Sequence, residues 1–282
     1  MSTSAHTEVD ASPLATARRI AQERQAAREA ARAAHAERRA AAPPKRSEAE
    51  LKEIVARGQQ LLHGSGIGAD DEASPAEVAA WAAEEFGTSL AVACSMADAA
   101  LPHLVSQAAP WVDVLFLETG YHFAETVGTR ERVAHEMDVT VVDVLPKLTV
   151  AEQDAEYGKD LFARDPAACC AMRKVEPLQR TLAGYEAWVT GVRREEAPTR
   201  ANTPLVTWDE KNGLVKINPV ASWSTEDLQN YADAHGVILN PLLNDGYPSI
   251  GCAPCTARVA PGADPRSGRW AGLDKTECGL HT

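Results

Sequence analysis

Residues 88–98 read Thr-Ser-Leu-Ala-Val-Ala-Cys-Ser-Met-Ala-Asp, an apolar run that passes directly into a helical pattern. Residues 88–94 predict a buried strand, and residues 98–107 predict a helix. Between them, the backbone N–H groups and the Ser95 hydroxyl lie where a strand meets a helix N-terminus, a place that suits a phosphate group. The turn holds no glycine, so by itself it is a weak phosphate-binding signature.

The same alternation of strand and helix continues along the chain. Apolar runs rich in β-branched residues predict strands at residues 112–117, 139–145 and 187–192, with a candidate fifth at 215–218. Short strands separated by helices predict an α/β fold, with a mostly parallel sheet covered by helices on both faces. The helices are predicted from capping boxes and apolar periodicity at residues 74–86, 123–137 and 225–235, with a further capping box at Thr149.

Sheets of this kind bind ligands beyond the carboxyl ends of their strands. The segments at that edge are therefore residues 94–98, 118–122 and 191–200. In the second of these, Gly120 permits a tight turn, whereas His122 taken alone is more typical of a structural residue. Cys94 ends an apolar strand, and we interpret it as a thiol of the core.

The sequence divides into three regions. Residues 1–46 are rich in Ala, Arg and Glu and end in two prolines, which indicates a flexible or transiently helical extension without a catalytic role. Residues 47–222 carry the strand and helix pattern of a nucleotide-binding α/β domain. Residues 223–282 continue that domain as a loop-rich segment with many prolines and glycines, and long loops in compact proteins are usually functional or disordered.

The composition is that of a globular protein, with 45% hydrophobic and 24% charged residues in 282. The net charge of −12 argues against nucleic acid as a partner. An anionic substrate would therefore need a local basic cluster within an acidic molecule.

Neither a membrane-spanning run of 18 apolar residues nor the apolar core of a signal peptide is present. We therefore expect no membrane partner and a cytoplasmic location. Thiols stay reduced in the cytoplasm, where paired cysteines more often bind metal than form disulfides.

Four of the six cysteines fall in two pairs, Cys169-Cys170 and Cys252-x-x-Cys255. Thiolates are soft ligands that suit zinc or an iron–sulfur cluster. The side chains of adjacent residues diverge, so both reach one ion only with strain, whereas a cluster with separated corners accommodates them more easily. Spacing alone leaves zinc, a [4Fe–4S] cluster and unligated thiols or a disulfide open.

Cys278 is the fifth residue counted from the end of the sequence, where chain ends fray and a core rarely recruits a residue. It is not needed to complete a four-cysteine site, and nearby cations such as Lys275 favour a thiolate. We interpret it as the nucleophile. His281 lies close enough to influence its protonation or to contact the same substrate.

Basic residues gather at strand ends and in the C-terminal segment. Guanidinium groups match phosphate and sulfate geometry in a bidentate manner, so these residues predict an anion site. A solvated run of charges is the plain alternative for Arg193-Arg194, although their place after a strand favours function. The other members are Arg173, Lys174, Arg200, Arg266 and Arg269.

Taken together, residues 89–282 resemble the assimilatory adenylylsulfate (adenosine 5′-phosphosulfate, APS) reductases of the phosphoadenylylsulfate (PAPS) reductase family. A departure lies in the loop after Ser95, where relatives often have a glycine or an acidic pair and this chain has Met96-Ala97-Asp98. The segments that carry the resemblance are CSMADAALPHL, FLETGYHFAET, YGKDLFARDPAACCAMRKVEPL, WVTGVRREEAPTRANTPLV, NPLLNDGYPSIGCAPCTARVAPGADPRSGRW and KTECGLHT.

The resemblance implies a Rossmann-like, adenine-nucleotide α-hydrolase-like fold and the conversion of APS and reduced thioredoxin, or a glutaredoxin-like reductant, into sulfite, AMP and oxidised thioredoxin. Cys278 would attack the sulfur of APS and become an S-sulfocysteine. By position in the motifs, the [4Fe–4S] ligands would be Cys169, Cys170, Cys252 and Cys255. The substrate contacts would be Ser95, Lys174, Arg266, Arg269 and His281, joined by an arginine of the Arg193-Arg194 pair.

Three alternatives stay open at this point. PAPS reduction by the same mechanism is the nearest, although PAPS-using relatives commonly lack both cysteine pairs. A zinc-bound, non-catalytic nucleotide-binding module is the second. An ATP-dependent thiolation or amidation enzyme is the third, and the absence of an S-G-G-x-D-S loop from the sequence counts against it.

Overall fold

The computed structural model describes residues 13–272, 275 and 277–280. The chain divides into two units, Met1–Ala41 and Ala42–Thr282. The smaller unit contains helix α1, Pro13–Ala40, with the sequence PLATARRIAQERQAAREAARAAHAERRA. Ala and Arg are strong helix formers, so this segment has a high intrinsic helix propensity along its whole length.

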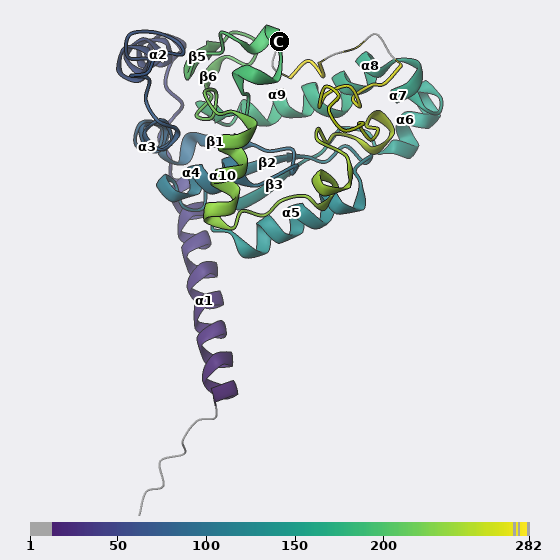
Figure 1. The fold of residues 1–282 in the computed structure, drawn as a ribbon. Coiled ribbons are helices and arrows are strands. Elements are labelled where there is room, and N and C mark those ends of the chain that lie inside the picture. Colours follow the sequence, from purple (N-terminus) through teal and green to yellow (C-terminus); the bar gives the residue numbers. More distant parts are fainter. Residues whose placement is uncertain (1–12, 273–274, 276, 281–282) are drawn as a thin grey trace, which may run out of the picture. The chain divides into compact units, whose positions relative to one another are not determined.

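The larger unit is built on one six-stranded sheet with the order β3-β2-β1-β4-β6-β5 (Figure 1). All neighbouring strands are parallel except the edge pair β5 and β6. The prediction of a mostly parallel α/β sheet is therefore confirmed. The strands are β1 Leu90–Ala93, β2 Asp113–Leu117, β3 Thr140–Val144, β4 Ala187–Val189, β5 Val206–Asp209 and β6 Leu214–Ile217.

Helices cover both faces of this sheet, as predicted (Figure 1). The alternation of side chains along β1 decides which residue faces which layer. Leu90 and Val92 join a large core with residues of helices α2 to α5. Ala91 and Ala93 point the other way, into a smaller core with Leu178 and Leu182 of α9.

Four helices begin at capping boxes that the sequence contains. Capping boxes start α2 at Ser47, α3 at Ser74, α6 at Thr149 and α10 at Ser224. Each box satisfies backbone N–H groups that have no partner within the helix. The helices are α2 Glu48–Leu62, α3 Pro75–Phe86, α4 Ala100–Ala108, α5 Ala124–Glu136, α6 Val150–Tyr157, α7 Leu161–Arg164, α8 Pro166–Cys170, α9 Glu176–Leu182 and α10 Thr225–His235.

After α10 the chain runs through turns and loops. Two 3₁₀ turns, Pro241–Asp245 and Ala253–Cys255, are accompanied by isolated bridges that pair Asp98 with Leu239 and Thr256 with Arg269. The first bridge attaches this loop-rich segment to the turn after β1. No helix in the described ranges is long and apolar enough to cross a membrane.

The order of the strands reverses between β1 and β4. From β1 the chain moves outward through β2 to β3, and it then returns to place β4 on the other side of β1. In open α/β sheets, ligands bind beside such a switch point, at the carboxyl ends of the strands. The turns after β1 and β4, which contain Ser95 and Arg193, lie at this position.

Candidate functional site

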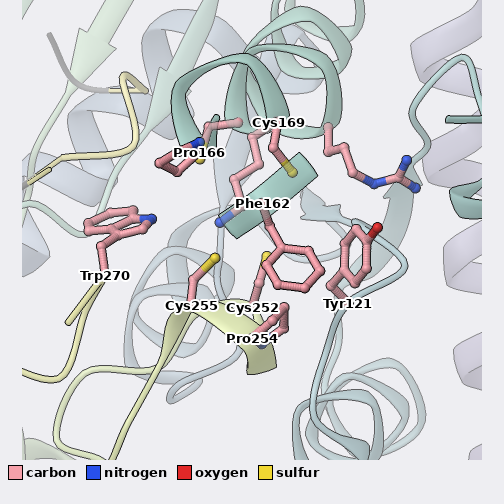
Figure 2. A pocket seen from close by; sticks show the side chains of 11 residues that line it. Tyr121, Phe162, Pro166, Cys169, Cys252, Pro254, Cys255 and Trp270 are labelled. Carbon is pink, nitrogen blue, oxygen red and sulfur yellow. The ribbon is translucent and has the colours of Figure 1, made fainter. Parts of the chain in front are cut away.

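The two cysteine pairs line one pocket in the larger unit (Figure 2). Cys169 and Cys170 end helix α8, whereas Cys252 directly precedes the 3₁₀ turn Ala253–Cys255 and Cys255 is its last residue. In Figure 2 the sulfur atoms of Cys169, Cys252 and Cys255 point into the same space. The remaining lining residues are Tyr121, Phe162, Pro166, Arg173, Lys174, Pro254 and Trp270.

The sequence before the first pair fixes where the pair lies. Pro166 starts α8, and the Asp165 carboxylate accepts a hydrogen bond from the Ala168 N–H (2.9 Å). Pro is well suited to a first helical position and Asp to the cap before it. After Cys170 the helix continues as a π-helical turn, Ala171–Val175, a local widening that is common at functional sites.

Backbone and side-chain hydrogen bonds hold the second pair. The Ala253 N–H donates to the Tyr121 carbonyl (2.7 Å), which joins this turn to the loop after β2. The Thr119 hydroxyl and the Cys252 sulfur share a hydrogen bond of 3.3 Å. Thr119 is completely buried, so its hydroxyl supports a sulfur atom in a region that bulk water does not reach. Sequence patterns gave no sign of this contact.

Three thiols of the pocket, Cys169, Cys170 and Cys255, have a raised pKa. Burial raises the pKa of Cys169 to about 12, and the negative charges of Cys170, Cys252 and Cys255 add to the effect. Burial also raises the pKa of Cys255, with Cys252 contributing in the same direction. A positively charged metal centre would reverse this balance, since a coordinating thiol is deprotonated.

All six cysteines lie within the described residues and carry free thiols. In that part of the chain, no group of three or more His, Cys, Asp or Glu side chains is arranged to hold one metal ion. The disulfide alternative therefore has no counterpart in this structure.

Arg173 supports the pocket from behind. Its guanidinium donates to the Thr119 and Leu148 carbonyls and to Gln153 Oε1 (3.0 Å), and only 4% of the residue is exposed. Gly120 makes this arrangement possible, because a Cβ there would lie 2.8 Å from Val150 Cγ2 and 3.1 Å from an Arg173 nitrogen. Its φ of +73° also favours glycine.

Lys174 brings a positive charge between the thiols and the C-terminal segment. Burial lowers the pKa of its ammonium group, but the electrostatic interactions with Cys252, Cys278 and Cys170 together outweigh burial, so the net shift of the pKa is upward. The lysine is therefore positively charged beside both the cysteine pocket and Cys278.

Cys278 lies near the cationic side of this region. Its thiol interacts electrostatically with Lys174 and Arg269. The chain around it is docked on the larger unit, because Lys211 Nζ donates to the Gly279 carbonyl (2.6 Å) and Leu280 packs against the smaller core. His281 lies outside the described residues.

Arg266 and Arg269 occupy the same region as Cys278. Arg269 stacks over the Trp270 ring at 4.6 Å and donates to the Ile250 carbonyl (3.3 Å). Burial lowers its pKa from the ordinary value, and the charge of Arg266 acts in the same direction. Arg266 forms an ion pair of 3.3 Å with Glu277, the residue before the predicted nucleophile.

Arg193 and Arg194 follow β4 and are engaged by carboxylates. Arg194 binds Glu72 through two nitrogens, each at 2.7 Å, in a nearly buried bidentate pair. Arg193 pairs with Glu195 (2.9 Å) and donates to the Thr225 hydroxyl (3.2 Å). Arg194 thus ties the turn after β4 to the segment before α3, and neither arginine lines the cysteine pocket.

The turn after β1 leaves Ser95 exposed and buries Met96 in a left-handed conformation with φ +59°. Asn240 supports the turn. Its amide nitrogen donates to the Met96 carbonyl and to Thr126 Oγ1, both at 3.1 Å, and the residue is fully buried. Sequence reasoning missed Asn240, whose only signal was the asparagine-proline pair at the start of a turn.

Cys94 packs against the larger core. Burial raises the pKa of its thiol to about 12, and the Asp98 carboxylate contributes in the same direction. Such a thiol is a poor nucleophile near neutral pH, in agreement with its interpretation as a core residue.

The comparison with known families now decides the family. The model of the phosphoadenosine phosphosulfate reductase domain matches residues 88–258, a range that contains the sheet and both cysteine pairs. The chain belongs to the phosphoadenosine phosphosulfate reductase family. The expected resemblance is thereby confirmed.

Similar members of this family are named adenosine 5′-phosphosulfate reductase. The relative from Mycolicibacterium smegmatis is 59% identical over 83% of this chain and 96% of its own length, and that from Streptomyces coelicolor is 57% identical over 84% and 97%. The relative from Mycobacterium tuberculosis is 51% identical, over 83% and 96%. Among solved structures, the phosphoadenylyl-sulfate reductase of Candida auris matches 74% of this chain and 97% of its own with a TM-score of 0.59 and 26% identity.

Proposed function

We propose that this member of the phosphoadenosine phosphosulfate reductase family is an oxidoreductase that reduces APS to sulfite and AMP in assimilatory sulfate reduction and cysteine biosynthesis, with thioredoxin as the electron donor. The observation that carries the proposal is that Lys174 and Arg269 interact electrostatically with the Cys278 thiol beside a pocket lined by four cysteines. The names of relatives at 51% to 59% identity support APS as the substrate.

The reaction has two steps. In the first, the Cys278 thiolate attacks the sulfur of APS, the bond between that sulfur and the bridging oxygen breaks, and AMP leaves with the bond's electron pair. The product is an S-sulfocysteine on Cys278. In the second, a thioredoxin thiolate attacks the Cys278 sulfur and sulfite leaves; a second thioredoxin thiol then releases Cys278 as a thiol and oxidised thioredoxin.

The cationic residues would stabilise the first step. Negative charge moves onto the AMP phosphate as the sulfur–oxygen bond breaks, and preorganised cations that face developing charge are a large source of rate enhancement. Lys174 and Arg269 lie within electrostatic reach of the Cys278 thiol. We assign binding of the phosphosulfate to Lys174, Arg269 and Arg266, and retain His281 in this role from the sequence prediction. Ser95 and an arginine of the Arg193-Arg194 pair would act on the nucleotide from the switch point.

Cys169, Cys170, Cys252 and Cys255 would hold a [4Fe–4S] cluster. Adjacent cysteines in one helix and a C-x-x-C turn suit the separated corners of a cluster, and four soft thiolate donors match iron. Since thioredoxin provides both electrons, the cluster would not need to transfer any. It would instead supply fixed charge and a cross-link between α8 and the loop-rich segment. A thioredoxin-dependent enzyme with six free thiols fits a cytoplasmic location.

The decisive variant is Cys278→Ser. We expect it to lose sulfite production and the S-sulfo adduct while it keeps the iron content and the brown colour of the wild type. The adduct is detected by mass spectrometry after one turnover without thioredoxin. An S-sulfo adduct that still forms on this variant would refute Cys278 as the nucleophile.

Two further measurements separate the competing functions. Turnover of APS compared with PAPS distinguishes the proposal from PAPS reduction, the activity named for the Candida auris structure. Iron and sulfide near equal amounts after anaerobic purification, with broad visible absorbance, distinguish a cluster from zinc. A colourless zinc protein without turnover would instead indicate a non-catalytic nucleotide-binding module.

A further inference from the structure

Glu277, the residue before Cys278, is bound by two arginines from different parts of the chain. Arg200 donates to both carboxylate oxygens of Glu277, each at 2.9 Å. Arg266 contacts the same carboxylate at 3.3 Å. One carboxylate thus joins the turn after β4 to the C-terminal segment.

These ion pairs are shielded from solvent more than typical surface pairs. The side chains of Arg200, Glu277 and Arg266 are 12%, 20% and 23% exposed. A single Arg200 nitrogen, Nη2, contacts both oxygens of Glu277, and Arg266 Nη2 contacts one of them as well. Charge-assisted hydrogen bonds of this kind are stronger than neutral ones, so together they restrain the chain at Glu277, whereas an exposed pair would contribute little.

The arginine is itself held in place. Arg200 also donates to Glu196, whose carboxylate pairs with Arg193 at 3.5 Å. The chain of alternating charges thus runs from Arg193, in the turn that follows the central strand β4, to the residue beside the nucleophile. Arg193 and Glu196 follow the buried strand β4. The ion pairs therefore fix the position of Glu277 relative to the rigid sheet.

Cys278 is fixed on its other side as well. The Gly279 carbonyl accepts from Lys211 Nζ at 2.6 Å, and Leu280 packs on the smaller core. The nucleophile therefore lies between two anchored neighbours. Of these anchors, Glu277 is the one whose own side chain forms ion pairs, with Arg200 and Arg266.

We propose that Glu277 is a positioning residue for Cys278, which holds the C-terminal segment closed over the phosphosulfate through Arg200 and Arg266. The inference rests on the proposed function, in which Cys278 attacks the substrate sulfur. That attack requires the thiolate to lie in line with the breaking bond. The later attack by thioredoxin requires the same sulfur to become accessible, so the closed contact serves the first step only.

The test compares Glu277→Gln with wild type in three measurements. Single-turnover formation of the S-sulfo adduct should slow by about 10- to 100-fold, since small misplacements of a reacting group cost rates of this order. Reduction of the preformed adduct by thioredoxin should keep its wild-type rate. The limiting rate of Cys278 alkylation by iodoacetamide at high pH should rise several-fold; at that limit the thiol is fully ionised, so the rate reports accessibility.

Two control variants accompany it. Asp245→Asn removes the exposed pair between Arg258 and Asp245, whose side chains are 62% and 56% exposed in the same loop-rich segment, and should leave all three rates unchanged. Glu277→Asp keeps the carboxylate on a shorter side chain and should recover part of the adduct rate.

A wild-type adduct rate in Glu277→Gln would overturn the proposal, and so would an unchanged limiting alkylation rate. Slower reduction of the adduct, in parallel with slower formation, would also contradict it, because a role confined to closure spares that step. Activity in Cys278→Ser would defeat the proposed function instead. In that case, the alkylation rates would still decide whether Glu277 holds the segment closed.

Discussion

Gly120 shows how a single backbone position sets the geometry of the pocket. It lies between Thr119, whose hydroxyl contacts the Cys252 sulfur, and Tyr121, whose carbonyl accepts from Ala253. Its left-handed φ and the close approach of Val150 and an Arg173 nitrogen leave no room for a side chain. The residue therefore acts on the cysteines without carrying any reactive group.

Gly120→Ala should destabilise the protein more than Gly213→Ala. Both glycines have a left-handed φ, of +73° and +64°, but nothing lies within 4 Å of a Cβ at Gly213. The conformational cost of about 1 kcal/mol is common to both, and crowding at Gly120 should add about 1–3 kcal/mol. Anaerobic denaturant unfolding of the two variants measures the difference.

The iron content of the same two variants provides a second comparison. Gly120→Ala should lower iron per protein, because displacement of Arg173 or Thr119 disturbs the support of the second cysteine pair. Gly213→Ala should retain the wild-type content. Equal destabilisation and equal iron content in the two variants would show that the space around Gly120 is unimportant.

The grouping of the cysteines was predictable from the sequence, whereas the residues that support them were not. The residue type and spacing of the two cysteine pairs predict a shared centre, and in the structure all four cysteines line one pocket. Thr119, Asn240 and Glu277 gain their roles from contacts across 133, 144 and 77 positions of the chain. No local pattern reports such contacts, since they depend on how the elements pack.

At the scale of elements, burial decided which strands could be predicted. The five predicted strands include all four central ones, β1, β2, β4 and β6, and the edge strand β3, and the residues of the central strands are mostly buried. The edge strand β5, with the sequence VTWD, buries only its first residue and shows no apolar run. The prediction also extended β4 to residue 192, whereas the strand ends at Val189 and Val192 belongs to the following turn.

Helix α2 was missed although its signal was present. Ser47 and Glu50 form the same reciprocal capping box that correctly predicted the starts of α3 and α6. The π-helical turn after Cys170 had no comparable signal. It arises within one continuous helical stretch, where the positions of Arg173 and Lys174 are constrained by their partners in the pocket.

Helix α2 and strand β5 also share a contact that should respond to pH. His63, at the end of α2, accepts a hydrogen bond from the Leu205 N–H at its Nε2 (3.0 Å). Burial lowers the pKa of His63 below its ordinary value of 6.5. As the pH falls, the unfolded chain therefore binds a proton at this histidine before the folded chain does.

The stability that neutral His63 contributes is consequently complete above pH 6.5. It is lost as the pH falls from that value through the lower pKa of the folded state. His63→Gln keeps an acceptor for Leu205 and should flatten the loss of unfolding free energy between pH values of about 6.5 and 5. An equal slope in this variant and in His135→Gln, which alters a histidine of α5, would contradict the assignment.

At the scale of the whole molecule, the larger unit contains the sheet, both cores and the cysteine pocket. The core residues begin at Leu51, and the family match begins at residue 88. The alignment with the Mycolicibacterium smegmatis relative covers 96% of that protein but only 83% of this chain. Within the described residues the smaller unit contributes no member of either core and lies outside the family match, so we expect it to fold separately. That it has no catalytic role stays a prediction.

Arg46 lies near the start of the larger unit and binds residues next to its sheet and helices. Its backbone N–H donates to Glu186 Oε1 (2.6 Å), and its guanidinium donates to Glu186 Oε2 and to Glu85. Glu186 directly precedes β4, and its side chain is only 8% exposed. Without Arg46, a nearly buried carboxylate at the edge of the central strand would lose its main partner.

Two truncations should therefore behave differently. Removal of residues 1–41 should leave APS turnover and unfolding free energy at their full-length values, because the larger unit begins at Ala42. Removal of residues 1–46 should lower the free energy of unfolding by about 2–3 kcal/mol, since it also deletes Arg46 and leaves the Glu186 carboxylate without its partner. Anaerobic denaturant unfolding and sulfite release measure the two effects.

Two outcomes interpret the truncations. If Glu186→Gln restores stability to the protein that lacks residues 1–46, the loss of stability is due to the unpaired Glu186 carboxylate. If removal of residues 1–41 lowers turnover, the N-terminal helix contributes to catalysis and the prediction for that region is wrong.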